Sequence, residues 1–203
     1  METQTKSPLT KPDRRAKRSK RLIIEAWREL VLEKDYKKIS VQDIVERADI
    51  GRATFYAHFD DKEHLDRFMF SQLLTQIENE IQAILDENEA QDNNYQNLVP
   101  SLALFRIAEE KHRWFKMNGT NPTTGLSMLI KPLSKRLENQ LDAMDLPPLK
   151  DDIPTHLTAT YLVSALIAIL TDWVMDDMPE PPEKMDATYQ SLAEPTLKRL
   201  LNA

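Results

Sequence analysis

Apolar residues recur along this chain at the three- and four-residue spacing of α-helices, and no stretch alternates with the two-residue period of a β-strand. One helix is predicted from about residue 13 or 17 to residue 34. Its buried stripe consists of Ile23, Ile24, Trp27, Leu30 and Val31. A second, longer helix is predicted from Lys62 to about Asn88, because this run contains no glycine or proline. The pattern therefore predicts an all-α fold.

The remainder of the chain keeps the helical pattern after a polar loop at residues 88–94. Further helices are predicted at about residues 95–111, 114–117, 122–144, 154–176 and 183–201. Pro195 interrupts the last of them.

With 203 residues, the chain is long enough for one large or two small domains. We predict a disordered tail over residues 1–12, where two prolines stand among polar residues. An N-terminal head follows over residues 13–61 and continues into the connecting helix 62–88. A larger helical domain then occupies residues 62–203.

Two short helices joined by a tight turn are predicted within the head. Ser40 is followed three residues later by Asp43, which is a capping box in its weaker aspartate form, so a helix is expected to begin at Val41. The turn is Asp49-Ile50-Gly51, and a second helix is predicted over residues 52–58. This layout is that of a helix-turn-helix, whose second helix can lie in a DNA major groove.

The sequence from Ile50 to Leu65 closely resembles the recognition-helix signature of the TetR family (TetR/AcrR type) of bacterial transcription regulators. The most specific part is the string Thr-Phe-Tyr-x-His-Phe-x-x-Lys at residues 54–62. The resemblance covers roughly residues 17–74, about a quarter of the chain. The family usually has glycine where this chain has Asp49, and often serine or threonine where it has Gly51; both substitutes are compatible with the same turn. The resemblance implies a three-helix helix-turn-helix DNA-binding head and a larger C-terminal helical ligand-binding and dimerisation domain.

Roles in DNA binding can be assigned to polar residues of the motif, at positions that match the DNA-contacting positions of the resembled family. Arg52 is the main candidate for base readout, because a guanidinium can pair with guanine through two hydrogen bonds. Gln42, and Ala53 against a thymine methyl group, are secondary base-reading candidates. Hydroxyl, imidazole and ammonium groups are expected to position the head on phosphates, and these belong to Ser40, Thr54, Tyr56, His58 and Lys62. The alternative for each is a structural role.

The net charge of −6 is unevenly distributed along the chain. Residues 1–60 contain 14 Lys and Arg against 10 Asp and Glu, whereas residues 61–203 contain 13 against 23. The run Lys11–Arg21 alone has seven basic residues and one acid. A basic head on an acidic body favours local attraction to DNA phosphates. A solvated basic tail is the alternative for the run taken by itself.

The predicted helix at residues 154–176 is apolar nearly all round, so it is expected to be buried on every side. A second copy of the chain would cover the side that the chain's own core does not, and the resembled family also pairs its last two helices as a four-helix dimer interface. The alternative is a fully internal helix in a monomer. The residues predicted for the dimer interface are Leu162, Leu166, Ile169, Trp173, Leu192, Leu197 and Leu200.

Aromatic and methionine side chains in the larger domain are candidates for lining a ligand pocket. They are Phe105, Trp114, Phe115, Met117, Met128, Tyr161 and Trp173. Residues of this kind at helical spacing more often form an ordinary core. The resemblance favours an apolar cavity for a small-molecule effector, whose identity the sequence does not reveal.

Catalytic, metal and membrane functions find no support in the sequence. The chain has no cysteine, only three glycines and four dispersed histidines, so a disulfide framework, a phosphate-binding loop and a metal site are not expected. We expect no enzyme and no cofactor. The longest apolar run, Tyr161–Leu170, is about half of a membrane span. With no apolar signal core at the N-terminus, a cytoplasmic location without membrane contact is expected.

The sequence therefore predicts a sequence-specific DNA-binding transcriptional regulator. We expect a homodimer that binds double-stranded DNA at a palindromic operator, most simply a repressor that responds to a small apolar effector. The alternative is a protein of the same fold whose output depends on a protein partner, as for a coactivator.

Overall fold

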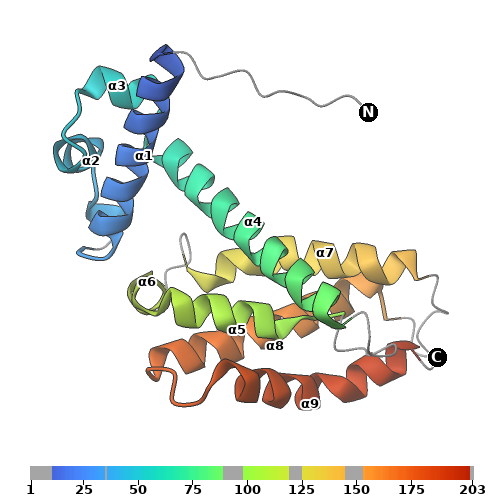
Figure 1. The fold of residues 1–203 in the computed structure, drawn as a ribbon. Helices are drawn as coiled ribbons and strands as arrows, with labels where there is room; N and C mark the ends of the chain where they lie inside the picture. The colour runs from blue at the N-terminus through green and yellow to red at the C-terminus, as the bar shows by residue number, and fades with distance from the viewer. Residues whose placement is uncertain (1–10, 35, 89–97, 119–124, 145–152, 202–203) are drawn as a thin grey trace. The chain divides into compact units, whose positions relative to one another are not determined.

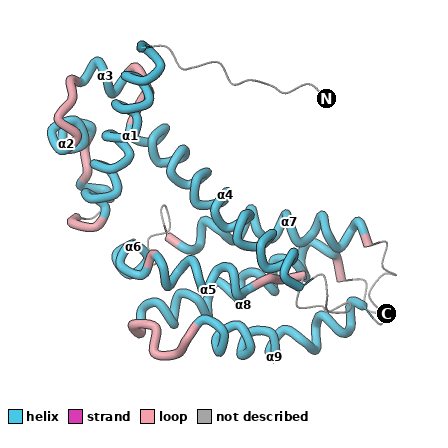
Figure 2. Tube along the Cα trace, viewed as in Figure 1, coloured by secondary structure: helices cyan, strands magenta, loops and turns pink. Residues whose placement is uncertain are grey.

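The structure, a computed structural model, describes residues 11–34, 36–88, 98–118, 125–144 and 153–201. All secondary structure within these ranges is helical (Figures 1 and 2), which confirms the predicted all-α fold. The α-helices are α1 (Lys11–Val31), α2 (Val41–Arg47), α3 (Arg52–Tyr56), α4 (Lys62–Asn88), α5 (Ser101–Glu110), α6 (His112–Asn118), α7 (Ile130–Ala143), α8 (Thr155–Met175) and α9 (Pro182–Leu201). Short 3₁₀ helices are η1 (Tyr36–Lys38) and η3 (Leu126–Leu129).

The chain divides into two compact units, residues 1–71 and residues 72–203. The long helix α4 begins in the first unit and continues into the second. Of the tail predicted at residues 1–12, residues 1–10 lie outside the described part of the chain, and α1 begins directly after them, at Lys11. The domain boundaries inferred from the sequence stay predictions.

The first unit is a small helical bundle around a core of aromatic and aliphatic side chains. Phe55 and Phe59 are fully buried, with their ring centroids 5.9 Å apart, and Phe59 in turn lies 5.6 Å from Phe68 of α4. The apolar stripe of α1 supplies Ile23 and Trp27 to the same core. Burial of these large side chains fixes α3 against α1 and α4, and α2 packs against both α1 and α3.

The second unit is built on α8, which packs against α7, α5, α6 and η3, while α5 packs against α9 (Figure 1). Tyr189 of α9 is buried and donates a hydrogen bond from its hydroxyl to the carbonyl of Leu162, at 3.0 Å. The single helix predicted over residues 122–144 is described only from Gly125, and it is divided into η3 and α7. Pro132 stands in the first turn of α7, where a proline ring is tolerated because the amide has no helical acceptor.

The residues predicted for the dimer interface differ in how far the single chain buries them. Four of them are at most 3% exposed within this unit: Leu162, Leu166, Trp173 and Leu197. Their side chains face the chain's own helices, because an apolar helix in a bundle turns one side inward. Ile169 is half-buried, Leu192 is 64% exposed, and the side chain of Leu200 lies outside the described part of the structure.

The outward side of α8 and α9 remains rich in apolar groups. Leu157 and Tyr161 are 52% and 59% exposed, and Met175 is 43% exposed. These three residues and Leu192 of α9 are here called the outer apolar face. Large exposed apolar side chains at helical spacing indicate a surface that another molecule covers.

By length and composition α8 is the one described helix that is long and apolar enough to cross a membrane, and half of that span is buried inside the chain. The core helix of a globular protein meets the same criteria. The apolar character of α8 is accounted for by its central position in the second unit.

Candidate nucleic-acid interface

The start of α2 is fixed by the capping box that the sequence predicts. The amide of Asp43 donates to the Ser40 hydroxyl at 3.2 Å, and the amide of Ser40 donates to the Asp43 carboxylate at 2.7 Å. The Lys34 ammonium lies 2.7 Å from the same carboxylate. Lys34 and the Ser40 hydrogen bonds lower the pKa of Asp43, so the carboxylate stays ionised and the cap persists at neutral pH.

The turn after α2 closes by a pair of backbone hydrogen bonds. The amide of Asp49 donates to the carbonyl of Glu46 at 3.2 Å, and the amide of Ile50 donates to the carbonyl of Val45 at 3.1 Å. This is a Schellman motif, with Asp49 in the left-handed conformation at a φ of 49°. Aspartate tolerates that conformation better than most residues, which explains how the chain makes the turn where the resembled family has glycine.

Gly51 stands at the N-cap of α3 without needing the conformational freedom of glycine. Its φ is −75°, and a Cβ atom placed there would meet nothing within 4 Å. It also offers no side-chain oxygen to the free amides of α3. The recognition helix is therefore held by its core contacts and by its neighbours and not by a cap.

The helix α3 presents one apolar and one polar side. Phe55 is buried in the core, and its ring lies edge-on to that of Tyr56 with centroids 5.5 Å apart. Tyr56 is 53% exposed, Arg52 and Ala53 are exposed, and Thr54 is half-buried. The helix ends at Tyr56, two residues before the predicted end. Three residues predicted to touch DNA thus reach the surface on the side of α3 that the core leaves open.

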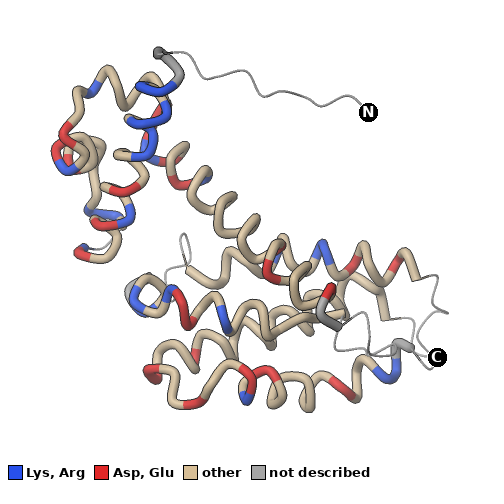
Figure 3. Tube along the Cα trace, viewed as in Figure 1, with Lys and Arg blue, Asp and Glu red and all other residues tan. Residues whose placement is uncertain are grey.

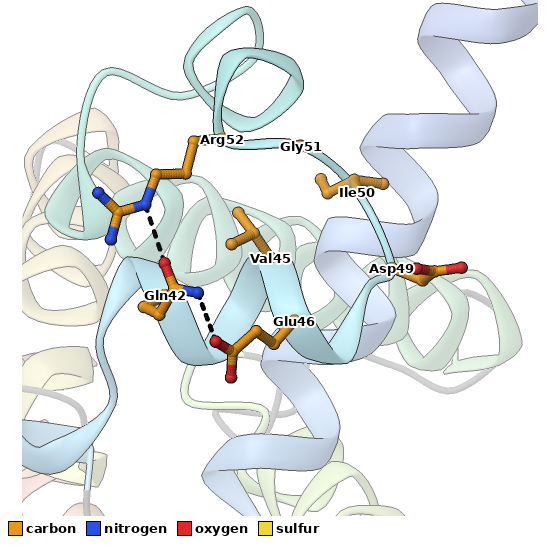
Figure 4. Close-up of a pocket in the computed structure, with 7 residues that line it drawn as sticks. All are labelled: Gln42, Val45, Glu46, Asp49, Ile50, Gly51 and Arg52. Atoms are coloured by element: carbon orange, nitrogen blue, oxygen red, sulfur yellow. Dashed lines mark hydrogen bonds between the residues drawn. The ribbon is translucent and has the colours of Figure 1, made fainter.

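Arg52 and Gln42 are brought together by the fold, although they lie on different helices (Figure 4). The Nε of Arg52 donates a hydrogen bond to the Oε1 of Gln42 at 2.9 Å. The Gln42 amide nitrogen in turn donates to the Oε1 of Glu46, one helical turn further along α2. These three residues line an open hollow between α2 and α3, together with Val45, Asp49, Ile50 and Gly51. Glu46 is not among the residues predicted from the sequence, although its i,i+4 spacing from Gln42 is a signal of this contact.

His58 is tied to α1. Its Nε2 lies 2.7 Å from the hydroxyl of Ser19, a residue that the sequence analysis did not single out. Burial, and then the nearby charge of Lys20, lower the pKa of His58, so the ring is neutral at pH 7. The predicted phosphate contact of His58 stays a prediction, and the structure adds a contact that holds α1 to the end of the recognition segment.

Lys62, at the start of α4, has partners within the first unit. Its ammonium donates to the carbonyl of Ile39 at 3.0 Å and to that of Tyr36 at 3.2 Å, and it lies 4.1 Å from the centre of the Tyr36 ring. These contacts join α4 to the segment that leads into α2. Carbonyl partners carry no side-chain signature, so the sequence did not reveal this role.

Replacement of Lys62 by alanine is expected to lower the free energy of unfolding by about 1–3 kcal/mol, because two carbonyls lose a charged donor. Chemical unfolding of the variant measures this loss. The control is Lys38→Ala, which removes an exposed lysine from the segment that leads into α2. A role confined to DNA phosphates predicts a different result: unchanged unfolding and a salt dependence of DNA binding reduced by about one phosphate contact.

Basic side chains gather on the first half of α1 (Figure 3). Arg15, Lys17 and Arg18 are exposed there. Arg47 of α2, by contrast, is engaged by Glu29 at 3.1 Å and by Glu33 at 2.6 Å. The exposed cations of this unit therefore concentrate on α1, within the same unit as the helix-turn-helix.

The residues predicted to line a ligand pocket occupy different environments in the second unit. Phe105 and Trp173 are buried with their rings edge-on at 5.3 Å, and the Trp173 indole donates to the carbonyl of Glu180 at 2.9 Å. The rings of Trp114 and Phe115 lie 4.7 Å apart. Tyr161 is on the surface, Met128 is half-buried, and the side chain of Met117 lies outside the described part. A role in ligand binding stays a prediction for all of them.

Clusters of three or more histidine, aspartate or glutamate side chains suited to a metal ion are absent from the described residues.

Two families of known proteins match the chain. The family described as "Bacterial regulatory proteins, tetR family" matches residues 23–65, and the one described as "Transcriptional regulator C-terminal region" matches residues 101–195. YxbF of Bacillus subtilis (strain 168), named as an uncharacterized HTH-type transcriptional regulator, is 33% identical over 78 residues. That match covers 38% of this chain and about a fifth (20%) of the length of YxbF.

Solved structures resemble the fold over most of its length. A TetR transcriptional regulator from Streptococcus agalactiae 2603V shares 24% identity with a TM-score of 0.64, covering 89% of this chain and 96% of that one. The dihydroxyacetone kinase operon activator DhaS shares 21% identity with a TM-score of 0.56, covering 90% and 98%. Both likenesses concern the fold.

Proposed function

The chain belongs to the TetR family of transcriptional regulators and carries a DNA-binding helix-turn-helix, and from this premise we propose that it represses transcription as an effector-responsive homodimer. The proposed binding site is a palindromic operator, with one head on each half-site. A cytoplasmic location is part of the same proposal, since the DNA of a bacterium lies there.

The observation that carries the proposal is the exposed polar side of α3, with Arg52 at its first position and Phe55 holding the opposite side in the core. A guanidinium at the start of a recognition helix can reach base edges in the major groove. DNA binding also requires attraction to phosphates that is independent of the DNA sequence, and the exposed cations of α1 provide it.

Dimerisation is supported by the outer apolar face: Leu157, Tyr161, Met175 and Leu192. A homodimer with two-fold symmetry would bury this face against its own copy. Two linked heads would then bind two half-sites centred about one helical turn of DNA, roughly 34 Å, or a multiple of it, apart. Occupation of a promoter by such a dimer blocks transcription, which is the simplest output.

An effector would act by binding one arrangement of the dimer more tightly than another, and the difference in binding energy would shift DNA affinity. The aromatic core around Phe105 and Trp173 is the proposed region for a small apolar ligand. The second candidate function is activation, which the naming of DhaS as an operon activator favours for a protein of this fold.

The test is binding of the purified protein to a duplex taken from beside its own gene, measured over a range of salt concentrations. Repression predicts saturable binding that is stronger than to an unrelated duplex and that falls steeply as salt increases. In a transcription assay on the same fragment, added protein should lower transcript yield. An increase in yield would favour the activator, and equal binding to both duplexes would contradict the proposal.

A further inference from the structure

The hydrogen bonds between Arg52, Gln42 and Glu46 run in a single direction (Figure 4). Arg52 donates from Nε to the Gln42 carbonyl oxygen, and Gln42 donates from its amide nitrogen to the Glu46 carboxylate. An ionised carboxylate accepts hydrogen bonds and never donates them. Glu46 therefore selects the amide orientation of Gln42 in which the carbonyl oxygen faces Arg52. Arg52, which has only donors, favours the same amide orientation, so Glu46 reinforces it and restrains the Gln42 side chain.

The two hydrogen bonds leave the far end of the guanidinium open. Arg52 uses Nε for Gln42, and Figure 4 shows no hydrogen bond from either terminal nitrogen to the other residues drawn. Two parallel donors in a fixed fork match the O6 and N7 acceptors of guanine. The two hydrogen bonds that join Arg52, Gln42 and Glu46 are here called the relay. The relay leaves the terminal nitrogens of Arg52 available to pair with a guanine. Gln42 then supports Arg52 and does not read a base independently.

We propose that Glu46 is a positioning residue for sequence readout, which acts through Gln42 to hold Arg52 in the orientation that recognises a guanine. This inference rests on the proposed function. It assigns to the DNA face a carboxylate whose own contact with DNA would be unfavourable.

The base of the relay is rigid. Gln42 and Glu46 are one turn apart on α2, which is fixed at its start by the Ser40 capping box and at its end by the turn at Asp49. Arg52 extends from the next helix toward them across the open hollow. A guanidinium oriented in advance loses less conformational freedom on binding than a free one, which raises its discrimination between bases.

The same carboxylate repels phosphates, so Glu46 should reduce binding to every duplex while it increases selectivity. These opposite effects on affinity and selectivity distinguish a positioning role from simple repulsion of phosphates by a surface acid. A surface acid without a positioning role changes affinity alone. A base-reading group changes preference at its own base pair, independently of Arg52.

The experiment selects preferred duplexes from a pool randomised over about 20 base pairs, the span of two half-sites. It is carried out with the parent protein and with Glu46→Ala, Arg52→Ala and the double variant. The control is Glu25→Ala, which removes an exposed acid from α1 that pairs with Arg21 and contacts neither Gln42 nor Arg52. Thermal unfolding of each variant confirms that the head is folded.

Glu46→Ala is expected to reduce the preference for the guanine read by Arg52 by roughly 3- to 10-fold, and to raise binding to unrelated duplexes by about twofold. Glu25→Ala should raise binding to unrelated duplexes but leave the preference for guanine unchanged. The double variant should have the same preference as Arg52→Ala alone, since Glu46 acts through Arg52.

An unchanged preference profile in Glu46→Ala would overturn the inference, as would a loss in the double variant that is additive or falls on a different base pair. Either result leaves the proposed function intact, because the parent still selects its duplex. A parent that enriches no sequence would instead overturn the proposed function, and the inference with it.

Discussion

Arg52→Ala is expected to weaken binding to the preferred duplex by about 1–3 kcal/mol for each half-site, or roughly 5- to 150-fold, and to relax the preference at one base pair. The side chain is exposed and its hydrogen-bond partner among the described residues is Gln42, so its loss leaves the core around Phe55 unchanged. Titration of the variant against the preferred duplex, and against duplexes changed at single base pairs, measures both quantities.

Arg52→Lys separates charge from geometry. A lysine keeps the positive charge but has no planar fork, so it should retain the salt dependence and lose most of the discrimination. If Arg52→Ala binds its duplex as tightly as the parent does and with the same preferences, Arg52 reads no base, and the readout lies elsewhere on α2 or α3.

The helix-turn-helix was predictable because each of its parts depends on neighbours in sequence. The capping box needs only Ser40 and Asp43, which are three residues apart, and both form the expected hydrogen bonds. The start of α4 at Lys62 and its end at Asn88 were also predicted from the local composition. In these cases the residues that specify the structure lie close together in the sequence, so the local sequence pattern is sufficient to predict it.

Contacts between distant segments were not predictable in the same way. Lys62 bonds to main-chain carbonyls of Tyr36 and Ile39, and a carbonyl has no signature in the sequence. The relay through Glu46 depends on the distance between α2 and α3. The helix-turn-helix motif places these helices next to each other but does not specify which of their side chains come into contact. His58 reaches Ser19 across 39 positions for the same reason.

The dimer surface shows a further limit of periodicity. A helix that is apolar all round indicates burial but not which half faces its own chain, so periodicity does not distinguish Leu162 and Leu166, which face inward, from the outward residues. Only the packing of α8 against α7 and α5 reveals that Leu157 and Tyr161 are the outward residues. The proposed dimer interface therefore lies on the outward side of the same two helices, α8 and α9.

Tyr161→Glu combined with Leu192→Glu is expected to separate the dimer and to reduce operator affinity by about 100-fold or more. Both side chains are more than half exposed, so the single chain should fold normally. Two like charges in an apolar contact would oppose association, and unlinked heads lose the effective concentration that joins two half-sites.

Sedimentation velocity gives the mass, which should fall from twice 23.6 kDa to 23.6 kDa, and titration of the duplex gives the affinity. Met144→Glu is the matched control, since Met144 is an apolar residue exposed at the end of α7 and is not one of the four residues of the outer apolar face. It should leave mass and affinity unchanged. A parent protein that sediments as a single chain, or a double variant that stays dimeric and binds as the parent does, would exclude the outer apolar face as the dimer interface. The second result would direct the search to other exposed apolar residues, because the inner residues of α8 are already enclosed.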